Sequence, residues 1–337
     1  MSVILAVDCM GGDKAPKAVF EGMNLICRER GDIVFHLFGK QRILQKKLKK
    51  FPKLAGKSLI FHSPDVIKST AKVRDAIRRG QKSSLWMSIE HVKKGNAHAV
   101  LSAGNTGAFM GMSKLLFRTL SSIMRPAIVS ILPTQKGRTV MLDLGANSEC
   151  NEDHLTQFAI MGASYAQLML DKKQPTIGLL NIGEEHTKGN DVLRNAFEKI
   201  KKLKSRQFKF HGFVEGNDIL LGTTDVVVTD GFTGNVALKT AEGTARFLSG
   251  LIKNLFKNSI WGKIAYLLVK GGLKLLRRRI DPREYSGAVF IGLNGIAVKT
   301  HGGSDRVAFA RGAEYAISLV EKELNKKIKK QIEKINS

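Results

Sequence analysis

Short apolar runs alternate with longer segments of helical periodicity along most of the chain. Continuous apolar runs are typical of buried parallel strands, and their alternation with helices is typical of crossover units. Helical spacing is clear in segments such as His154–Leu170 and Asp191–Leu203. The pattern predicts a mostly parallel α/β sheet sandwiched by helices, in a single domain over residues 1–337. The predicted strands are Val3–Val7, Ile33–Phe38, Leu59–His62, Ala99–Ser102, Ala127–Leu132, Thr139–Leu142, Thr176–Leu180, Phe208–Phe213 and Asp225–Val228.

Five of these strands are followed by loops that are rich in glycine or polar residues. In open α/β sheets, ligands bind in the crevice beyond the carboxyl ends of the strands. We therefore expect the five loops to lie at one edge of the sheet and to form the functional site. The loops cover residues 8–13, 102–108, 143–147, 181–190 and 229–236.

The loop after the predicted strand Ala99–Ser102 has the composition of an anion site. Its small residues precede a helix, where free backbone N–H groups and the helix dipole both favour a negative ligand. This loop does not contain the Gly-Lys-Ser/Thr of a nucleoside-triphosphate loop, and it is not a GxGxxG motif with an acidic residue about twenty positions later. A small anion such as phosphate fits better, and the candidate phosphate-binding residues are Ser102, Gly104, Asn105, Thr106 and Gly107.

The other four loops supply candidates for binding and orienting a substrate. Two glycines after the first strand let the backbone approach a ligand closely, and the aspartates beside them can orient cationic side chains. The later loops add amides, further glycines and two lysines. These candidates are Asp8, Gly11, Gly12, Asp13, Asn147, Asn181, Glu184, Lys188, Gly231, Thr233, Asn235 and Lys239.

The charge balance of the chain is strongly basic. Lysine and arginine number 55 against 29 aspartates and glutamates, a formal net charge of +26. Such a field favours nucleic acid, an anionic membrane face or an acidic protein as a partner. The basic segments lack interleaved aromatic residues and any recognisable nucleic-acid-binding module, so we expect no nucleic-acid partner.

Three cysteines, Cys9, Cys27 and Cys150, form no metal-ligand spacing and leave one thiol unpaired in any disulfide scheme. They are interpreted as reduced thiols of a cytoplasmic protein. The N-terminal residues enter a strand directly and do not have the pattern of a signal peptide. No apolar run approaches the ~18 residues of a membrane-spanning helix. The sequence predicts a soluble protein that at most lies on a membrane surface.

Residues 244–280 differ in composition from the rest of the chain, with nine basic residues and no acidic one. We expect this segment to be a basic amphipathic helical insertion that protrudes from the domain and contacts an anionic membrane. A helical dimerisation element with a solvated basic side is the alternative. A second basic amphipathic helix is predicted over Glu321–Ile335. The apolar face of residues 244–280 contains Leu248, Leu251, Leu255, Phe256, Trp261, Leu267 and Leu268.

A set of motifs between residue 3 and about residue 312 resembles the acyl-ACP:phosphate acyltransferase family of bacterial phospholipid synthesis. The sequence departs from the family pattern at Lys68–Val73, where an aspartate and a proline are expected. The matching motifs are Asp8–Asp13, Ser102–Ala108, Arg125–Ala127, Asp143–Asn147, Gly178–Glu185, Lys188-Gly189, Glu215-Gly216, Asp230–Lys239, Glu242-Gly243, Gly292–Gly295, Lys299–Gly302 and Ser304-Asp305.

The resemblance implies a fold, an activity and a set of partners. The implied fold is Rossmann-like and similar to those of phosphotransacetylase and isopropylmalate dehydrogenase, in a protein that forms homodimers. The implied activity moves a long-chain fatty acyl group from acyl carrier protein to inorganic phosphate, with no cofactor and no metal. The product is acyl phosphate for a membrane glycerol-3-phosphate acyltransferase. The implied location is cytoplasmic, at the inner face of the cytoplasmic membrane.

Phosphate is itself a competent nucleophile, so no activated serine or cysteine is required, and no GxSxG elbow is present. Direct attack on a thioester needs an anion cradle, positioning and stabilisation of the oxyanion. We assign Lys188 and Asn235 to the last task, and the resemblance points to the same pair. His186 and His301 are weaker candidates, as acid–base groups.

Three other functions remain open. A phosphotransacetylase-like enzyme would use acyl-CoA, but the basic surface suits an acidic carrier protein better. A nicotinamide-dependent hydroxyacid dehydrogenase would need a carboxylate cluster for a divalent metal, and Asp143, Asp230 and Asp305 lack the expected companions. A nucleic-acid-binding protein is suggested only by the net charge.

Overall fold

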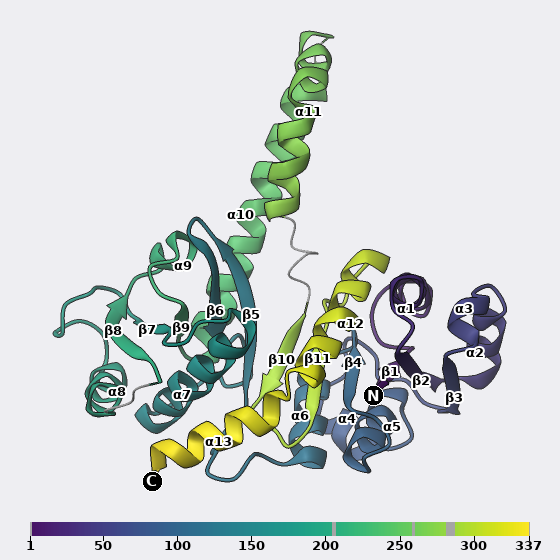
Figure 1. Ribbon diagram of the computed structural model, residues 1–337, viewed down its shortest axis with the longest axis horizontal. Helices are drawn as coiled ribbons and strands as arrows, with labels where there is room; N and C mark the ends of the chain where they lie inside the picture. The colour runs from purple at the N-terminus through teal and green to yellow at the C-terminus, as the bar shows by residue number, and fades with distance from the viewer. Residues whose placement is uncertain (1, 204–206, 258–259, 281–286, 337) are drawn as a thin grey trace.

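The computed structural model of the chain describes residues 2–203, 207–257, 260–280 and 287–336. Within these ranges, eleven strands form one mixed sheet with helices on both sides (Figure 1). The prediction of a mostly parallel α/β sheet between helices is confirmed. Across the sheet the strand order is β3 (Ser58–His62), β2 (Ile33–Gly39), β1 (Val3–Asp8), β4 (Ala99–Ser102), β11 (Ile296–Lys299), β10 (Ala288–Ile291), β5 (Ala127–Thr134), β6 (Gly137–Leu142), β9 (Val226–Val228), β7 (Thr176–Leu180) and β8 (Lys209–Val214).

The strands in the middle of the sheet, such as β1, β4 and β9, are apolar at most positions because both faces of the sheet are buried there. In β1, Leu5 and Val7 pack into one core, whereas Ala6 between them packs into the other. One face is covered by α1 (Lys17–Glu29), α2 (Gln41–Leu48), α3 (Pro52–Ala55), α7 (Glu152–Met169), α8 (Asp191–Lys202), α12 (Arg306–Glu321) and α13 (Leu324–Asn336). The other is covered by α4 (Val73–Arg79), α5 (Ser84–Lys93), α6 (Thr106–Phe117), α9 (Asp218–Leu221) and the first turns of α10 (Gly231–Lys257).

Strand direction reverses between the two halves of the sheet. The pairs β11–β10, β10–β5 and β5–β6 are antiparallel, and the pairs on either side of them are parallel. Strands β6, β9 and β7 therefore run opposite to β1 and β4. The expectation that all five loops lie at one edge of the sheet is wrong: two of them lie at one edge and three at the other.

Strands β10 and β11 were not among the predicted strands. They form a hairpin around Gly292-Leu293-Asn294-Gly295, and β10 pairs with β5 while β11 pairs with β4. The signal was available, because two short apolar runs flank a glycine- and asparagine-containing turn. This hairpin joins the two halves into one sheet.

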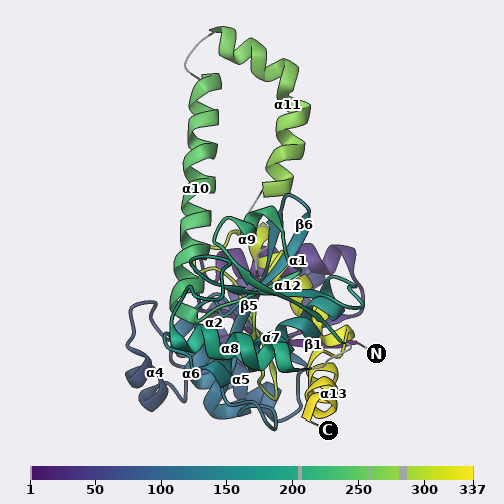
Figure 2. The ribbon, with the colours of Figure 1, turned by 90° about the vertical axis from the view of Figure 1, so that its left-hand side faces the viewer.

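Helices α10 and α11 (Ile260–Ile280) lie side by side and project from the body of the molecule (Figure 2). The rings of Phe256 and Tyr266 meet edge to face at 5.9 Å between centroids. In the described ranges, no helix is long and apolar enough to cross a membrane. The predicted basic segment 244–280 thus covers most of both helices, but α10 begins earlier, at Gly231. The side chains of residues 274–280 lie outside the described part of the chain.

The predicted C-terminal helix over Glu321–Ile335 is divided between two helices. α12 ends at Glu321 and α13 begins at Leu324, after a left-handed residue at Glu323 (φ 52°). Leu324, Ile328 and Ile332 are buried and belong to the core that includes α7. The apolar stripe of this helix is therefore used for packing within the domain.

Candidate active site

Three loops meet at the carboxyl ends of β1, β4 and β11, and we call residues 8–13, 102–107 and 300–305 the first loop cluster. The buried carboxylate of Asp8 accepts hydrogen bonds from the hydroxyl groups of Ser84, at 2.6 Å, and Ser102, at 2.7 Å. Burial raises the pKa of Asp8 despite these bonds. A Cβ added at Gly11 would lie 2.4 Å from Oδ2 of Asp8 and 2.8 Å from the amide nitrogen of Gly104, so only glycine fits there.

The third member of the first loop cluster is held by backbone contacts. The amide of Asp13 donates to the carbonyl of Gly302 at 2.8 Å, and the amide of Thr300 donates to the carbonyl of Ser102 at 3.0 Å. Gly12 has a φ of +101°, and a Cβ there would lie 2.8 Å from Cβ of Ala103. The predicted residues Asp8, Gly11, Gly12 and Asp13 are thus brought together with the predicted phosphate loop.

The phosphate loop leads directly into α6, as predicted. The side chain of Asn105 caps the helix by accepting from the amide of Ala108 at 2.9 Å, and its amide group donates to the carbonyls of Ser69 and Ala71. The hydroxyl of Ser102 accepts from the amide of Gly104.

Ser102 and Asn105 therefore shape the loop. The amides of Thr106 and Gly107 occupy the first turn of α6, where an α-helix provides no acceptor. Both residues are exposed. These two amides are consequently the ones that can donate to a bound anion.

A second loop cluster lies at the opposite edge of the sheet and contains residues 143–147, 181–190 and 230–235. Its centre is Asp143, whose carboxylate is fully buried. Oδ1 accepts from the amides of Ile128, Gly145 and Ala146 at 2.9–3.1 Å. Oδ2 accepts from the backbone and side-chain amides of Asn147, both at 2.8 Å. Asp143 was not among the predicted site residues, yet its carboxylate holds the loop of residues 143–147 together.

Helix α10 begins against this loop. Asp230 caps the helix, accepting from the amide and the hydroxyl of Thr233, both at 2.8 Å. The amide of Gly231 donates to the carbonyl of Asn147 at 2.7 Å, and a Cβ at Gly234 would lie 2.0 Å from the carbonyl oxygen of Asp143. These close approaches place the exposed Asn235 next to Gly145. A Cβ added at Gly145 would lie 3.6 Å from Cβ of Asn235.

The loop after β7 carries the predicted residues Asn181, Glu184 and Lys188. Asn181 is buried and its side-chain amide lies 3.4 Å from the carbonyl of Lys188, whereas Glu184 and Lys188 are exposed. Since β9 lies between β6 and β7, this loop is the neighbour of the one that holds Asn235. The structure thus brings the predicted pair Lys188 and Asn235 to the same loop cluster.

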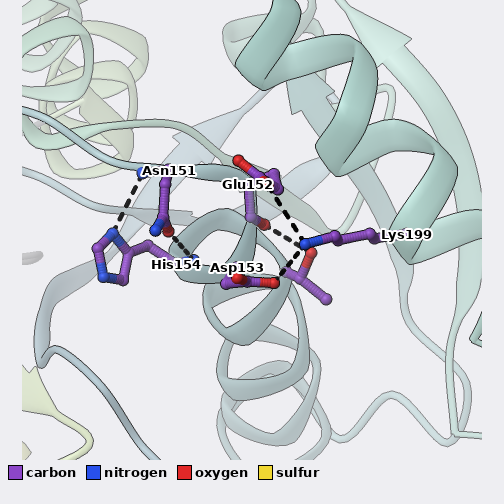
Figure 3. A network of polar contacts seen from close by, with 6 residues as sticks. Asn151, Glu152, Asp153, His154 and Lys199 are labelled. Atoms are coloured by element: carbon purple, nitrogen blue, oxygen red, sulfur yellow. Dashed lines mark hydrogen bonds and ion pairs between the residues drawn. The ribbon is translucent and has the colours of Figure 1, made fainter.

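A polar network behind the second loop cluster ties its helices together (Figure 3). Asn151 and His154 cap the start of α7 reciprocally, with bonds of 2.9 and 3.1 Å. Lys199 of α8 reaches the same turn and pairs with Asp153 at 2.6 Å and Glu152 at 3.4 Å. The network fixes α8, which follows the loop of Lys188, against α7, which follows the loop of Asn147.

Helix α10 also connects the two loop clusters. Lys239 lies one helical turn, about 6 Å, beyond Asn235 on the same side of the helix. Its ammonium pairs with Glu242 at 2.9 Å and is close enough to lower the pKa values of His301 and Lys299, although burial is the larger cause for both. The predicted Lys239 therefore lies beside the first loop cluster, one helical turn beyond Asn235, which lies beside the second.

Residues 3–327 match the model of the fatty acid synthesis protein family. A phosphate acyltransferase of Rhodospirillum rubrum is 47% identical over 334 residues, which cover 99% of this chain and 95% of that relative. A phosphate acyltransferase of Paramagnetospirillum magneticum is 45% identical with the same coverage. The chain belongs to the phosphate acyltransferase family. The resemblance seen in the motifs is confirmed, and the protein is an acyltransferase.

Solved structures agree with this family in fold. A phosphotransacetylase from Streptococcus pyogenes superposes with a TM-score of 0.63 at 15% identity, covering 96% of this chain and 94% of that one. The EutD phosphotransacetylase from Staphylococcus aureus gives 0.58 at 12% identity, covering 95% and 94%. The expected similarity to the phosphotransacetylase fold is confirmed. The dehydrogenase alternative is set aside because the similar chains named above are phosphate acyltransferases.

Proposed function

We propose that the protein transfers a long-chain fatty acyl group from acyl carrier protein to inorganic phosphate, producing acyl phosphate for phospholipid synthesis. Membership in the phosphate acyltransferase family supports acyl transfer to phosphate. The observation that carries the finer proposal is the combination, around α10, of an amide-lined anion loop with exposed apolar side chains. A long-chain acyl phosphate has the same two parts, an anion and an alkyl chain.

The apolar part of the site lies in the second loop cluster. Ile182, Phe232 and Val236 are 81%, 67% and 51% exposed, although large apolar side chains are usually buried. Phe232 and Val236 are four residues apart on α10 and so lie on one side of the helix. They flank Asn235. A thioester carbonyl bound at Asn235 would therefore have its alkyl chain beside these apolar side chains.

The proposed mechanism is direct displacement. An oxygen of phosphate, held by the amides of Thr106 and Gly107, forms a bond to the thioester carbonyl carbon, and the carbonyl oxygen becomes an oxyanion. The ammonium of Lys188 and the side-chain amide of Asn235 donate to this oxyanion. Collapse of the tetrahedral intermediate breaks the C–S bond and releases the carrier thiolate. The proton that hydrogen phosphate carried passes to this thiolate through water.

The choice of donor rests on charge. Acyl carrier protein is acidic as a class, and a net charge of +26 favours encounter with an acidic protein. Coenzyme A carries the same thioester without an acidic protein surface. We therefore expect acyl carrier protein to be the donor. The family resemblance implies a homodimer, which we expect to be the active form.

The α10–α11 projection supports association with a membrane surface. Trp261, Leu267 and Leu268 are 80%, 60% and 83% exposed, and Lys263 and Lys270 lie on the same helix. Exposed apolar and basic side chains on one helix are typical of helices that lie in the interface of an anionic bilayer. The product would then form beside a membrane acyltransferase that consumes it.

The test incubates the protein with radiolabelled phosphate and one of two donors, a long-chain acyl carrier protein or the same acyl chain on coenzyme A. We expect labelled acyl phosphate with the carrier protein and little with coenzyme A. Equal rates with both donors would contradict the assigned donor and favour a phosphotransacetylase-like activity. No acyl phosphate with either donor would contradict the proposed function.

A further inference from the structure

Lys299, the last residue of β11, is a buried cation inside the first loop cluster. It is only 8% exposed, and its Nζ donates to the carbonyl oxygens of Thr300 and, at 3.4 Å, of Ala103. Among the described residues it forms no salt bridge, although buried charges in proteins are normally paired. A buried ammonium that forms no ion pair leaves a charge for which an anionic ligand is the natural partner.

The position of Lys299 relates it directly to the phosphate loop. It pairs with Ser102 in the register between β11 and β4, and Ala103, whose carbonyl it reaches, belongs to residues 102–107. An ammonium has three N–H donors, and the two carbonyls accept two of them. The described parts of the chain provide no acceptor for the third, which can therefore donate to a ligand.

The charged groups around Lys299 come from three directions. Asp8 and Asp13 lie on β1 and the loop after it, Lys239 lies on α10, and His301 lies on the loop that follows β11. Burial and, to a smaller extent, Lys239 lower the pKa of Lys299 to about 8, while Asp13 and Asp8 act in the opposite direction. The side chain is thus poised to gain a proton when a negative charge arrives.

We propose that Lys299 binds the phosphate substrate from beneath the 102–107 loop and supplies the positive charge that the amides of Thr106 and Gly107 lack. This role rests on the proposed function, because it assigns phosphate to that loop. An anion close to the ammonium favours its charged form. Phosphate binding is therefore coupled to uptake of a proton by Lys299, and this coupling is strongest above pH 8.

The test compares the parent protein with Lys299→Met, which keeps the length and the apolar stem of the side chain. Lys322→Met is the matched control, because Lys322 is also partly buried and bonds a carbonyl, that of Leu168 at 2.8 Å. Removing one partner of a buried charge pair typically weakens binding by about 30-fold or more. We expect the KM for phosphate to rise by about that factor in Lys299→Met and to stay unchanged in Lys322→Met.

Proton uptake is measured by titrating phosphate into the parent protein at pH 8.5, in buffers that differ in ionisation enthalpy. We expect uptake in the parent and in Lys322→Met, and none in Lys299→Met. A purely structural lysine would not produce this difference. If Lys299→Met folds, an unchanged KM for phosphate overturns the proposal. If it does not fold, the measurement on the parent protein decides, and phosphate binding between pH 8 and 9 without proton uptake overturns the proposal.

These measurements separate the two proposals. A parent protein that binds phosphate with proton uptake but makes no acyl phosphate keeps the role of Lys299 and contradicts the acyl-transfer function. Suppose instead that the parent makes acyl phosphate, and that Lys299→Met keeps both the parental KM for phosphate and the proton uptake. The proposed function then stands, and the role of Lys299 in binding phosphate is contradicted.

Discussion

Asp143 offers the sharpest test of how the second loop cluster is held. Its buried carboxylate accepts five hydrogen bonds, three at Oδ1 and two at Oδ2, and these bonds organise residues 143–147 and the start of α10. In Asp143→Asn, one of the two oxygens becomes an NH₂ group that can only donate. Whichever way the amide turns, at least two buried N–H groups lose their acceptor and face another donor.

The cost follows from that count. Each buried donor left without a partner costs about 1–3 kcal/mol, so Asp143→Asn should lower the free energy of unfolding by roughly 2–6 kcal/mol. Unfolding entropy scales with chain length, and for a chain of 337 residues about 0.7 kcal/mol corresponds to one degree in Tm. We expect Tm to fall by about 3–8 °C on the same basis.

The assay is calorimetric unfolding of the parent, Asp143→Asn and a control, Asp153→Asn. Asp153 has a half-exposed carboxylate that pairs with Lys199 at 2.6 Å. Exposed ion pairs contribute about 1 kcal/mol or less, so the control should melt within about two degrees of the parent. Asp143→Asn melting as close to the parent as the control does would refute the role assigned to this carboxylate.

Four further predictions follow from the site and its surface. Lys188→Ala and Asn235→Ala should each lower kcat by about 10²–10³ with Tm unchanged, and near-parental rates of acyl phosphate formation would refute either assignment. The kcat/KM for acyl carrier protein should fall as salt rises, because exposed charges are screened beyond about 10 Å at 0.1 M ionic strength; a flat salt profile argues against electrostatic docking. Making Leu267 and Leu268 acidic should reduce co-sedimentation with anionic liposomes while activity in solution survives, so unchanged binding would exclude this segment as the anchor. Because the pKa of Lys299 is about 8 when folded and 10.5 when unfolded, the unfolded chain holds the extra proton between these values, and stability should rise with pH there. The free energy of unfolding of the parent should rise by about 3 kcal/mol relative to that of Lys299→Met over this pH range. Stability curves of the two proteins that run parallel with pH would contradict the prediction.

Much of the fold was determined by local sequence. The predicted strands Val3–Val7 and Ala99–Ser102 are recognisable because a strand buried on both faces is apolar at most of its positions. The cap and helix start at Asn105 and Thr106 follow from residue chemistry within four positions. The family motifs likewise single out residues 102–107, the predicted phosphate loop, and the loops of Lys188 and Asn235 without reference to coordinates.

The relative placement of these loops was decided only by the tertiary structure. The connection between the predicted strands Ala127–Leu132 and Thr139–Leu142 is too short for a parallel crossover, so β5 and β6 are antiparallel and the strand direction reverses there. The β10–β11 hairpin adds two antiparallel pairings between β4 and β5 and therefore leaves these two strands parallel. Which strands are neighbours in the sheet, and hence which loops share an edge, depends on pairings between distant segments.

Burial of single polar groups was also beyond the sequence. Asp143 and Lys299 are ordinary motif residues when read along the chain, and the residues beside them in sequence do not distinguish them from surface residues. Their environments arise from contacts such as Asp143 to Ile128 and Lys299 to Ala103, which join distant segments. Desolvation depends on all of the protein that surrounds a group. The charge state of Lys299 is therefore set by the folded molecule, whereas the apolar run that forms β11 is set by the local sequence.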